Sequence, residues 1–248
     1  MSKSIVIVGG HGRTALRLAR LLSPSNRITS VIRSPSAEQT KDIEEAGATP
    51  VVLSLEDVTA NDFTELFRKI SADVVYFCAG AGLRASEERV EGVEYEGTVK
   101  ICDAIEAIGA DKRPRFISIS ALDIRDPDKI PEHYNEEDKQ VSARIRNLMP
   151  RYIHWRYEAD KNVVARSDLK WTIVRPGGLR DTAGTGSASL GKAHLSILLS
   201  RDDLASILAE LLSRDDAAGL AIDSVGGDVP ISEGVDRFIK HGVTDWIG

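Results

Sequence analysis

Short apolar runs alternate with helix-like segments along the first half of the chain. The first run, 5–8, is β-branched and ends in glycines, which indicates a buried strand followed by a turn. By the same criteria, further strands are predicted at 27–32, 50–53, 73–77, 115–119, 169–174 and 220–224, and another is considered at 195–199. Helices are predicted at 14–22, 37–46, 63–70, 90–108, 144–166, 202–213 and 234–240.

Strands that alternate with helices need crossover connections, and these place the strands in a parallel sheet. We therefore predict an α/β fold: one Rossmann-like domain over 1–248, with a doubly wound parallel sheet and helices on both faces. The alternation fails after residue 120. We expect 121–150 and 180–199 to form a small C-terminal substrate lobe, with 181–190, rich in Gly, Ala, Ser and Thr, as a mobile loop.

Composition narrows the class of protein. The 248 residues are 42% hydrophobic and 28% charged, as in an ordinary globular protein, and the net charge of −6 argues against a nucleic-acid partner. No apolar run approaches the ~20 residues of a membrane span. Two cysteines cannot build a disulfide framework, which favours the reducing cytoplasm. We expect a monomer or a small homo-oligomer that binds a small molecule.

Charged residues are segregated in the middle of the chain. Seven acidic residues lie between Asp123 and Asp138, and a basic stretch covers 144–166. We interpret them as two solvated faces of opposite sign. A metal site at Glu132, His133, Glu136 and Glu137 is the less favoured alternative, because no cysteine pair or H-E-x-x-H motif supports it, so no metal is expected.

The strongest motif lies between the first strand and the first helix. Gly10, Gly12 and Ala15 match G-x-G-x-x-G/A, and Gly9, Gly12 and Ala15 also fit G-x-x-G-x-x-A. Small residues here permit the turn, the approach of a pyrophosphate and close packing of helix on strand, while the helix N-terminus attracts phosphate. The motif predicts a dinucleotide site to which Arg13 also contributes.

The second strand bears on the choice of cofactor. An NAD site usually carries an acidic residue about 20 residues beyond the glycines, where it binds the ribose 2′-hydroxyl. Here the strand ends at Arg33, and no acidic residue appears before Glu38. A guanidinium in that place binds a 2′-phosphate, so NADP is favoured, with NAD as the alternative.

Several motifs together resemble a known family. They are GGHGRTA from Gly9, VVYFCAGAG from Val74, RFISISA from Arg115 and WTIVRPGGL from Trp171. The chain resembles the atypical short-chain dehydrogenase/reductases, and within them the NmrA-like and epimerase/dehydratase-like NAD(P)-binding proteins. The resemblance implies cofactor contacts from the glycine loop and from residues that follow the strands: Gly9, His11, Gly12, Arg13, Thr14, Arg33, Ser54, Leu55, Cys78, Ala79, Gly80, Ala81, Ser120, Pro176, Gly177, Gly178 and Leu179.

The resemblance also implies a catalytic Ser, Tyr and Lys, and Ser120 stands at the Ser position. Two pairs compete for the other roles. Tyr157 and Lys161 form a literal Y-x-x-x-K, whereas the spacing from Ala159-Asp160 to Pro176 selects Tyr152 and Arg156. We favour Tyr152 as the proton donor, with Arg156 in place of Lys. That both tyrosines serve only packing stays open.

We therefore expect an NADP(H)-dependent oxidoreductase that acts on a small carbonyl or conjugated substrate. An NADP-binding redox sensor with little catalysis and an epimerase-like enzyme are the alternatives.

Overall fold

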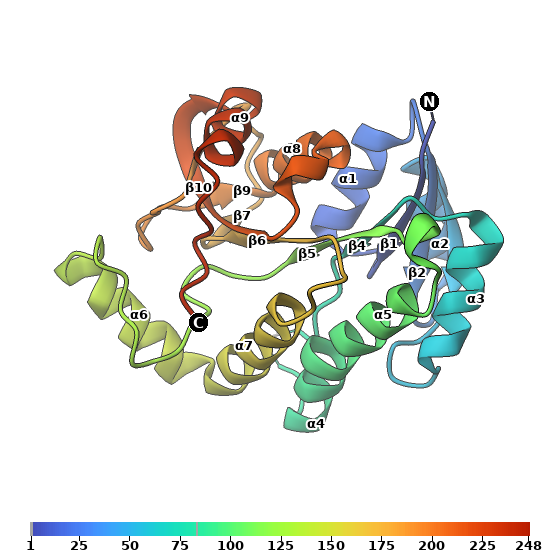
Figure 1. The fold of residues 1–248 in the computed structure, drawn as a ribbon, viewed down its shortest axis with the longest axis horizontal. Coiled ribbons are helices and arrows are strands. Elements are labelled where there is room, and N and C mark those ends of the chain that lie inside the picture. Colours follow the sequence, from blue (N-terminus) through green and yellow to red (C-terminus); the bar gives the residue numbers. More distant parts are fainter. Residues whose placement is uncertain (1, 83) are drawn as a thin grey trace.

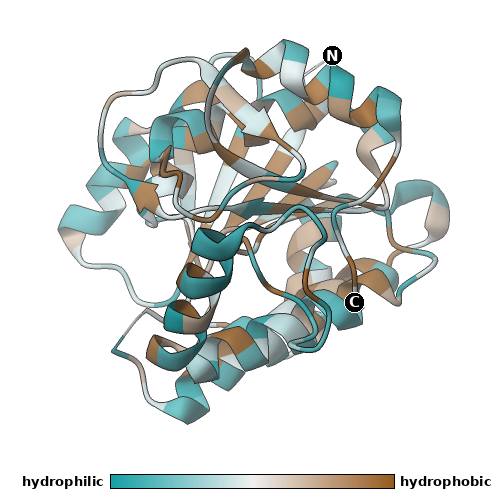
Figure 2. Cartoon of the chain, turned by 90° about the vertical axis from the view of Figure 1, so that its left-hand side faces the viewer, coloured by the Kyte–Doolittle hydropathy of each residue, from teal (hydrophilic) through white to brown (hydrophobic). Residues whose placement is uncertain are grey.

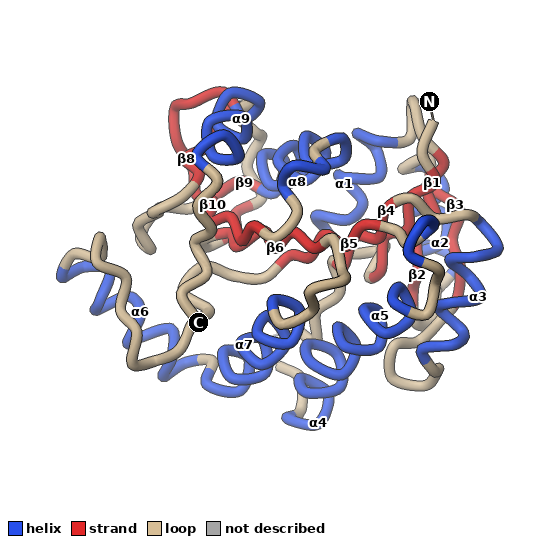
Figure 3. Tube along the Cα trace, viewed as in Figure 1, coloured by secondary structure: helices blue, strands red, loops and turns tan. Residues whose placement is uncertain are grey.

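An eight-stranded sheet runs through the middle of the molecule in the computed structural model, which describes residues 2–82 and 84–248 (Figures 1 and 3). All neighbouring strands are parallel except the pair β10–β8. The order is β3 (Ala48–Val52), β2 (Arg27–Ile32), β1 (Ser4–Val8), β4 (Val74–Phe77), β5 (Arg115–Ile119), β6 (Trp171–Pro176), β10 (Leu220–Pro230) and β8 (Ser187–Leu190). The strand order reverses between β1 and β4, which is where doubly wound sheets bind ligands. The predicted fold class is confirmed.

Helices cover both faces of the sheet and turn their apolar residues towards it (Figure 2). One face carries α1 (Arg13–Leu22), α2 (Ala37–Glu45), α8 (Arg201–Glu210) and α9 (Ile231–His241). The other carries α3 (Ala60–Ile70), α5 (Gly97–Glu106) and α7 (Pro150–Val164). Because both faces are covered, residues on both sides of a central strand are buried, as in β1, where every residue is buried.

The prediction of one helix over 144–166 is wrong. The chain forms α6 (Glu136–Leu148) and then α7, with Met149 between them at φ −132° and ψ 49°. Pro150 causes the break, because it has no N–H for the preceding turn and its ring disfavours helical backbone at the residue before it. As the first residue of α7, the same proline is well tolerated.

The predicted helix over 90–108 has an irregular start. It begins with α4 (Glu87–Val90), passes through a π-helical segment, Glu91–Glu96, and continues as α5. π-Helical turns are rare and are found disproportionately at functional sites. This one places Glu94 against the loop that follows β4, where the Ala81 amide donates a 2.9 Å hydrogen bond to its carboxyl group.

The region expected to form a substrate lobe is only partly separate from the sheet. Part of the stretch predicted as a mobile loop is β8, which pairs with β10, so that prediction is wrong for 187–190. Of the strand considered at 195–199, only Leu199 belongs to β9 (Leu199–Ser200), which pairs with β7 (Leu179–Arg180). The two sections of the lobe share a small core of Leu122, Tyr134, Ala193, Leu195 and Val225.

The acidic stretch is not a solvated face throughout, so that interpretation is corrected. Asp123 and Asp138 have exposed fractions of 0% and 1%. Asp123 pairs with Arg125 at 2.7 Å and with Arg146 at 3.3 Å. Asp138 caps α6 and accepts hydrogen bonds from the Leu195 amide, 2.8 Å, and the His194 ring, 2.6 Å. Both buried carboxyl groups therefore have cations or hydrogen-bond donors as partners, as buried polar groups require.

Candidate cofactor and substrate site

The glycine loop lies at the carboxyl end of β1, at the point where the strand order reverses. Gly9 has a φ of +80°, and a Cβ there would lie 2.6 Å from the Ala79 backbone. A Cβ at Gly10 would lie 2.4 Å from the Ser30 Cβ. Gly12 is different, because its nearest neighbour, the Gly9 carbonyl oxygen, would be 3.2 Å away. The first two glycines are required by the fold, whereas Gly12 leaves space beside the N-terminus of α1.

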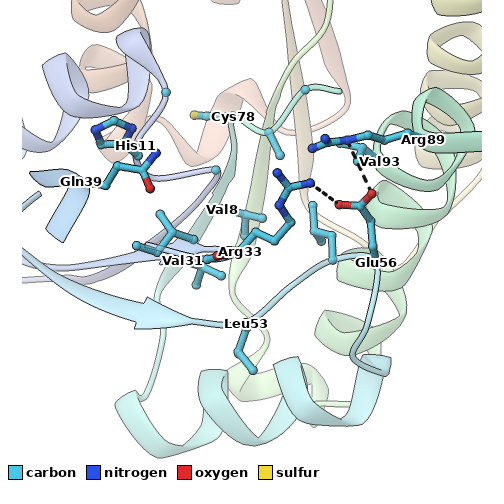
Figure 4. A pocket seen from close by; sticks show the side chains of 17 residues that line it. Val8, His11, Val31, Arg33, Gln39, Leu53, Glu56, Cys78, Arg89 and Val93 are labelled. Carbon is cyan, nitrogen blue, oxygen red and sulfur yellow. Dashed lines mark hydrogen bonds and ion pairs between the residues drawn. The ribbon is translucent and has the colours of Figure 1, made fainter. Parts of the chain in front are cut away.

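A cavity of about 320 Å³ opens beside this loop and extends over the carboxyl ends of β1 to β4 (Figure 4). We call it the glycine-loop cavity. Its apolar wall comes from residues such as Val8, Val31 and Leu55, and Gly12 also belongs to its lining. The residues predicted to bind cofactor that line it are Gly9, His11, Gly12, Arg33, Leu55, Cys78, Ala79 and Gly80.

Three charged side chains meet at one edge of the glycine-loop cavity (Figure 4). Glu56 accepts a 3.0 Å hydrogen bond from Arg33, and its other carboxyl oxygen lies 3.5 Å from Arg89 Nε. The cluster carries a net charge of +1. The sequence analysis identified Arg33 but not Glu56, which follows β3, or Arg89, which lies on α4; the three side chains meet only in the folded chain.

Some predicted cofactor residues are engaged elsewhere. Arg13 donates a 2.5 Å hydrogen bond to Asp181, on the chain segment after β7, and is not among the residues that line the glycine-loop cavity. His11 lines the cavity but its ring contacts Asp42 of α2 at 2.8 Å. Thr14 and Ser54 are buried, and neither belongs to the cavity lining.

The segment after β4 joins this cavity to a second one. Gly80 lines both, so the two cavities lie next to each other along the carboxyl edge of the sheet. Cys78 lies at the start of that segment, and burial raises the pKa of its thiol to about 12. The thiol is therefore neutral and acts as a small apolar group in the cavity wall.

The second cavity has a volume of about 640 Å³, and we call it the apolar cavity. Most of its wall consists of aliphatic side chains and glycine or alanine backbone. Among the described lining residues only Glu94, Arg151 and Tyr152 have polar side chains. Arg151 is exposed and pairs with Glu87 at 3.4 Å. The predicted site residues that line this cavity are Gly80, Ala81, Tyr152, Pro176, Gly177, Gly178 and Leu179.

A buried polar network lies behind the apolar cavity. Ser120 donates a hydrogen bond to one carboxyl oxygen of Asp160, and the Arg156 guanidinium donates two to the other, 2.8 and 3.1 Å long. The Glu94 carboxyl lies 3.7 Å from Arg156 Nη1. Ser120 and Arg156 are thus brought together, but by Asp160, to which the sequence analysis gave no role. The spacing of Arg156 and Asp160, four residues apart on one helix face, was the available signal.

The two tyrosines occupy different surroundings. Tyr152 lines the apolar cavity, and burial raises the pKa of its phenol, with the nearby Glu94 adding to the effect and Arg156 opposing it. The positive charge of Arg156, which lowers that pKa, is therefore outweighed. Tyr157 stacks on Trp246 with ring centroids 5.8 Å apart, and exposed Lys161 lies over its ring. The literal Y-x-x-x-K pair is thus not among the residues lining the apolar cavity.

Residues 2–82 and 84–248 contain no evident metal site. No group of three or more His, Cys, Asp or Glu side chains in that part of the chain is placed to hold a metal ion. The ring of His133, considered earlier as a ligand, lies 3.2 Å from the Ala193 carbonyl oxygen. No described helix is both long enough and apolar enough to cross a membrane.

Two relatives resemble the chain over nearly its full length. UPF0659 protein of Schizosaccharomyces pombe is 35% identical over 244 residues, covering 97% of each chain. The uncharacterized sugar epimerase YhfK of Bacillus subtilis is 31% identical over 235 residues, covering 94% of this chain and 99% of that one.

Solved structures share the fold. A Bacillus halodurans protein named as an NAD-dependent epimerase/dehydratase superposes with a TM-score of 0.77, at 27% identity and with 95% of this chain and 100% of that one covered. A short-chain dehydrogenase/reductase of Veillonella parvula, in complex with NADP, superposes with a TM-score of 0.67, at 18% identity and with 93% and 97% covered.

The family model described as NAD(P)H-binding matches residues 9–215, which include the glycine loop, both cavities and the buried network between them. The resemblance inferred from the motifs is thereby confirmed, and the chain belongs to the NAD(P)H-binding family of Rossmann-fold proteins, alongside its epimerase/dehydratase-like relatives.

Proposed function

We propose that this protein is an NADP(H)-dependent oxidoreductase that acts on a small, largely apolar carbonyl or conjugated substrate. The observation that carries the proposal is that the glycine-loop cavity and the apolar cavity adjoin at Gly80. A dinucleotide that spans both cavities would have its phosphates at the glycine loop and its nicotinamide beside the apolar cavity.

The residues present fit such a cofactor. Gly12 leaves space where a pyrophosphate approaches the backbone, and the N-terminus of α1 presents free N–H groups there. Cys78, Ala79 and Gly80 would line the ribose, and Pro176, Gly177 and Gly178 would flank the nicotinamide at the other end. Arg13 would have to exchange its hydrogen bond with Asp181 for one with a phosphate.

The charge at the edge of the glycine-loop cavity supports NADP over NAD. Arg33 and Arg89 face one carboxylate, Glu56, so the cluster has a cationic surplus that suits a 2′-phosphate. Glu56 also offers the acidic oxygen that an NAD-binding protein uses for the 2′-hydroxyl, so its pairing with the two arginines decides the preference.

The lining of the apolar cavity supports a reductase acting on an apolar molecule over a sugar epimerase. A sugar exposes many hydroxyl groups, and a buried hydroxyl without a partner costs about 1–3 kcal/mol. The described lining offers only three polar side chains, Glu94, Arg151 and Tyr152. Aliphatic groups such as Leu122, Ile145 and Leu179 instead favour a hydrocarbon or aromatic body.

A bound reduced nicotinamide supplies a hydride, and the protein must then orient the acceptor and provide a proton. The apolar wall excludes water from the acceptor, which protects the hydride and strengthens electrostatic contacts. Tyr152 and Glu94 are the two lining residues that can carry a transferable proton at neutral pH. Since Cys78 and Cys102 are free, we also place the protein in a reducing compartment, the cytoplasm.

The test has two stages. Binding of NADPH and NADH is measured by calorimetry, and NADPH oxidation is then followed with quinones, flavins, enals and aldehydes. Epimerisation of nucleotide sugars is followed in parallel by proton NMR. We expect tighter binding of NADPH and its oxidation by at least one apolar acceptor. Sugar epimerisation without net NADPH consumption would replace the proposal with the epimerase, and tight binding with neither reaction would replace it with the redox sensor.

A further inference from the structure

Glu94 occupies an unusual position for a carboxyl group. It lies on the π-helical segment Glu91–Glu96, has an exposed fraction of 3%, and lines the apolar cavity beside Tyr152. One of its oxygens accepts the Ala81 amide hydrogen bond, and Ala81 belongs to the segment that would hold the cofactor. Glu94 therefore connects the wall of the apolar cavity with the proposed cofactor path.

The charges around Glu94 do not balance if every group is ionised. Two carboxyl groups, Glu94 and Asp160, face one cation, the fully buried Arg156. Three ionised groups would leave a net charge of −1 away from water, which costs several kcal/mol in a protein interior. A proton on one of the two carboxyl groups makes the network neutral.

The hydrogen bonds indicate which carboxyl holds the proton. Asp160 accepts three, two from Arg156 and one from Ser120, and this pattern stabilises an ionised carboxylate. Glu94 accepts only one, from Ala81, and stands 3.7 Å from Arg156 Nη1, which has no hydrogen-bond partner among the described residues. Burial raises the pKa of Glu94; Arg156 and the Ala81 amide oppose this, and Asp160 adds to it.

We propose that Glu94 is the proton donor of this site and that the neutral Arg156–Asp160–Glu94 network keeps it protonated for that role. This inference rests on the proposed reductase function. Tyr152, the donor expected from the family resemblance, would then orient the substrate, because its phenol is the weaker acid of the two.

The proposed reduction combines a hydride transfer from the cofactor with a proton transfer from Glu94. A hydride from the reduced nicotinamide dinucleotide forms a C–H bond at the electrophilic carbon of the carbonyl or conjugated acceptor. The Glu94 O–H bond breaks, and its proton goes to the substrate oxygen or to the carbon that carries the developing negative charge. The dinucleotide leaves oxidised, and the Glu94 carboxylate takes up a proton from water. During the step Arg156 faces two carboxylates, which its charge stabilises.

The first measurement uses the cofactor-free protein and needs no substrate. Glutamate carboxyl carbons are labelled with ¹³C and titrated by NMR in the wild type and in Glu94→Gln, which identifies the Glu94 signal. We expect that signal to titrate above the ordinary Glu value of 4.5. Titration at or below that value would overturn the proposal and would leave the reductase function untouched.

The second measurement compares three variants with any acceptor that the wild type reduces. Glu94→Gln should lower kcat about 10²-fold and abolish the fall in rate that accompanies deprotonation of the acid at rising pH. Tyr152→Phe should lower kcat less and keep that fall. Glu96→Gln, at an exposed position of the same segment, should match the wild type.

Two controls distinguish the loss of the Glu94 proton from damage to the fold and from failure of the proposed reductase function. Glu94→Asp keeps the acid on a shorter side chain, so it should regain part of the rate and the pH dependence. Full activity of Glu94→Gln would overturn the proposal. A protein that reduces no acceptor would overturn the reductase function, whereas the NMR titration would still decide whether Glu94 holds a proton.

Discussion

Arg33 donates a 3.0 Å hydrogen bond to Glu56 at the edge of the glycine-loop cavity, so the guanidinium expected to bind a 2′-phosphate is paired with a carboxylate. Glu56 shares its other oxygen with Arg89 at 3.5 Å (Figure 4). The carboxylate holds both cations in place but also competes with any phosphate for them. We therefore expect cofactor preference to depend on three side chains, which follow β2, follow β3 and lie on α4, rather than on the end of the second strand alone.

Arg33→Ala should weaken NADPH binding about tenfold or more and leave NADH binding nearly unchanged, because only NADPH presents a 2′-phosphate. Glu56→Gln should tighten NADPH binding by a few fold, since it removes the competing charge and frees both arginines. Calorimetry at fixed ionic strength measures both. The control is Lys41→Ala, which likewise removes one positive charge, but from an exposed position on α2. Equal losses for NADPH and NADH in Arg33→Ala would contradict this assignment.

Two glycines of the same loop should respond differently to alanine. Gly9→Ala forces a Cβ to within 2.6 Å of the Ala79 backbone at a φ of +80°, so the free energy of unfolding should fall by about 2 kcal/mol or more. Gly12→Ala brings its Cβ to 3.2 Å from the Gly9 carbonyl oxygen and to ordinary contact distance from Cys78 and Ala15, and should cost about 1 kcal/mol or less.

Although Gly12→Ala should change stability little, it should weaken cofactor binding strongly. Its new methyl group would stand where a pyrophosphate approaches the backbone, so NADPH affinity should drop at least about tenfold in a stably folded protein, and Gly12→Val should bind still more weakly. Urea unfolding and calorimetry together check the pair. Unchanged NADPH affinity in Gly12→Val would show that the loop is only a turn.

The sequence predicted features that depend on neighbouring residues. The apolar run 5–8, the glycines behind it and the alternation of strands and helices predict a parallel sheet, and the structure brings Gly12, Cys78 and Pro176 to one edge of it. Features that depend on contacts between residues far apart in the chain could not be predicted from the sequence. Glu94 shows this clearly, because its burial follows from a π-helical segment, from Arg156 on α7 and from the Ala81 amide, none of which forms a local pattern.

Tyr157 packs against the C-terminal segment of the chain. Its ring stacks on Trp246 at 5.8 Å and 21°, and Trp246 also packs against the core on that face of the sheet. Tyr157→Phe keeps the stack and should leave turnover and stability nearly unchanged. Tyr157→Ala removes it and should lower the free energy of unfolding by at least about 1 kcal/mol, measured by urea unfolding. A large loss of turnover in Tyr157→Phe would restore the Tyr157–Lys161 pair as the catalytic one.

Asp223 should make stability depend on pH in the neutral range. It is buried on β10, 3.3 Å from Arg175, with Asp245, Asp123 and Tyr134 nearby. Burial raises the pKa of its carboxyl to about 7, because desolvation and the neighbouring Asp245 and Asp123 outweigh the attraction of Arg175. In the unfolded chain the group returns to its ordinary value of 3.8.

Between those two values the folded protein holds a proton that the unfolded chain has released, so the contribution of Asp223 to the free energy of unfolding falls as the pH rises from about 4 to about 7 and then levels off. The slope from this group is at most about 1.4 kcal/mol per pH unit. Half-buried Asp245, whose pKa is also raised by burial, acts in the same direction. Asp223→Asn should flatten the dependence, whereas Asp228→Asn, at an exposed position of the same strand, should preserve it. Urea unfolding at several pH values measures the slopes. Equal slopes in the wild type and Asp223→Asn would mean that Asp223 stays ionised beside Arg175, with the ion pair strong enough to overcome its burial.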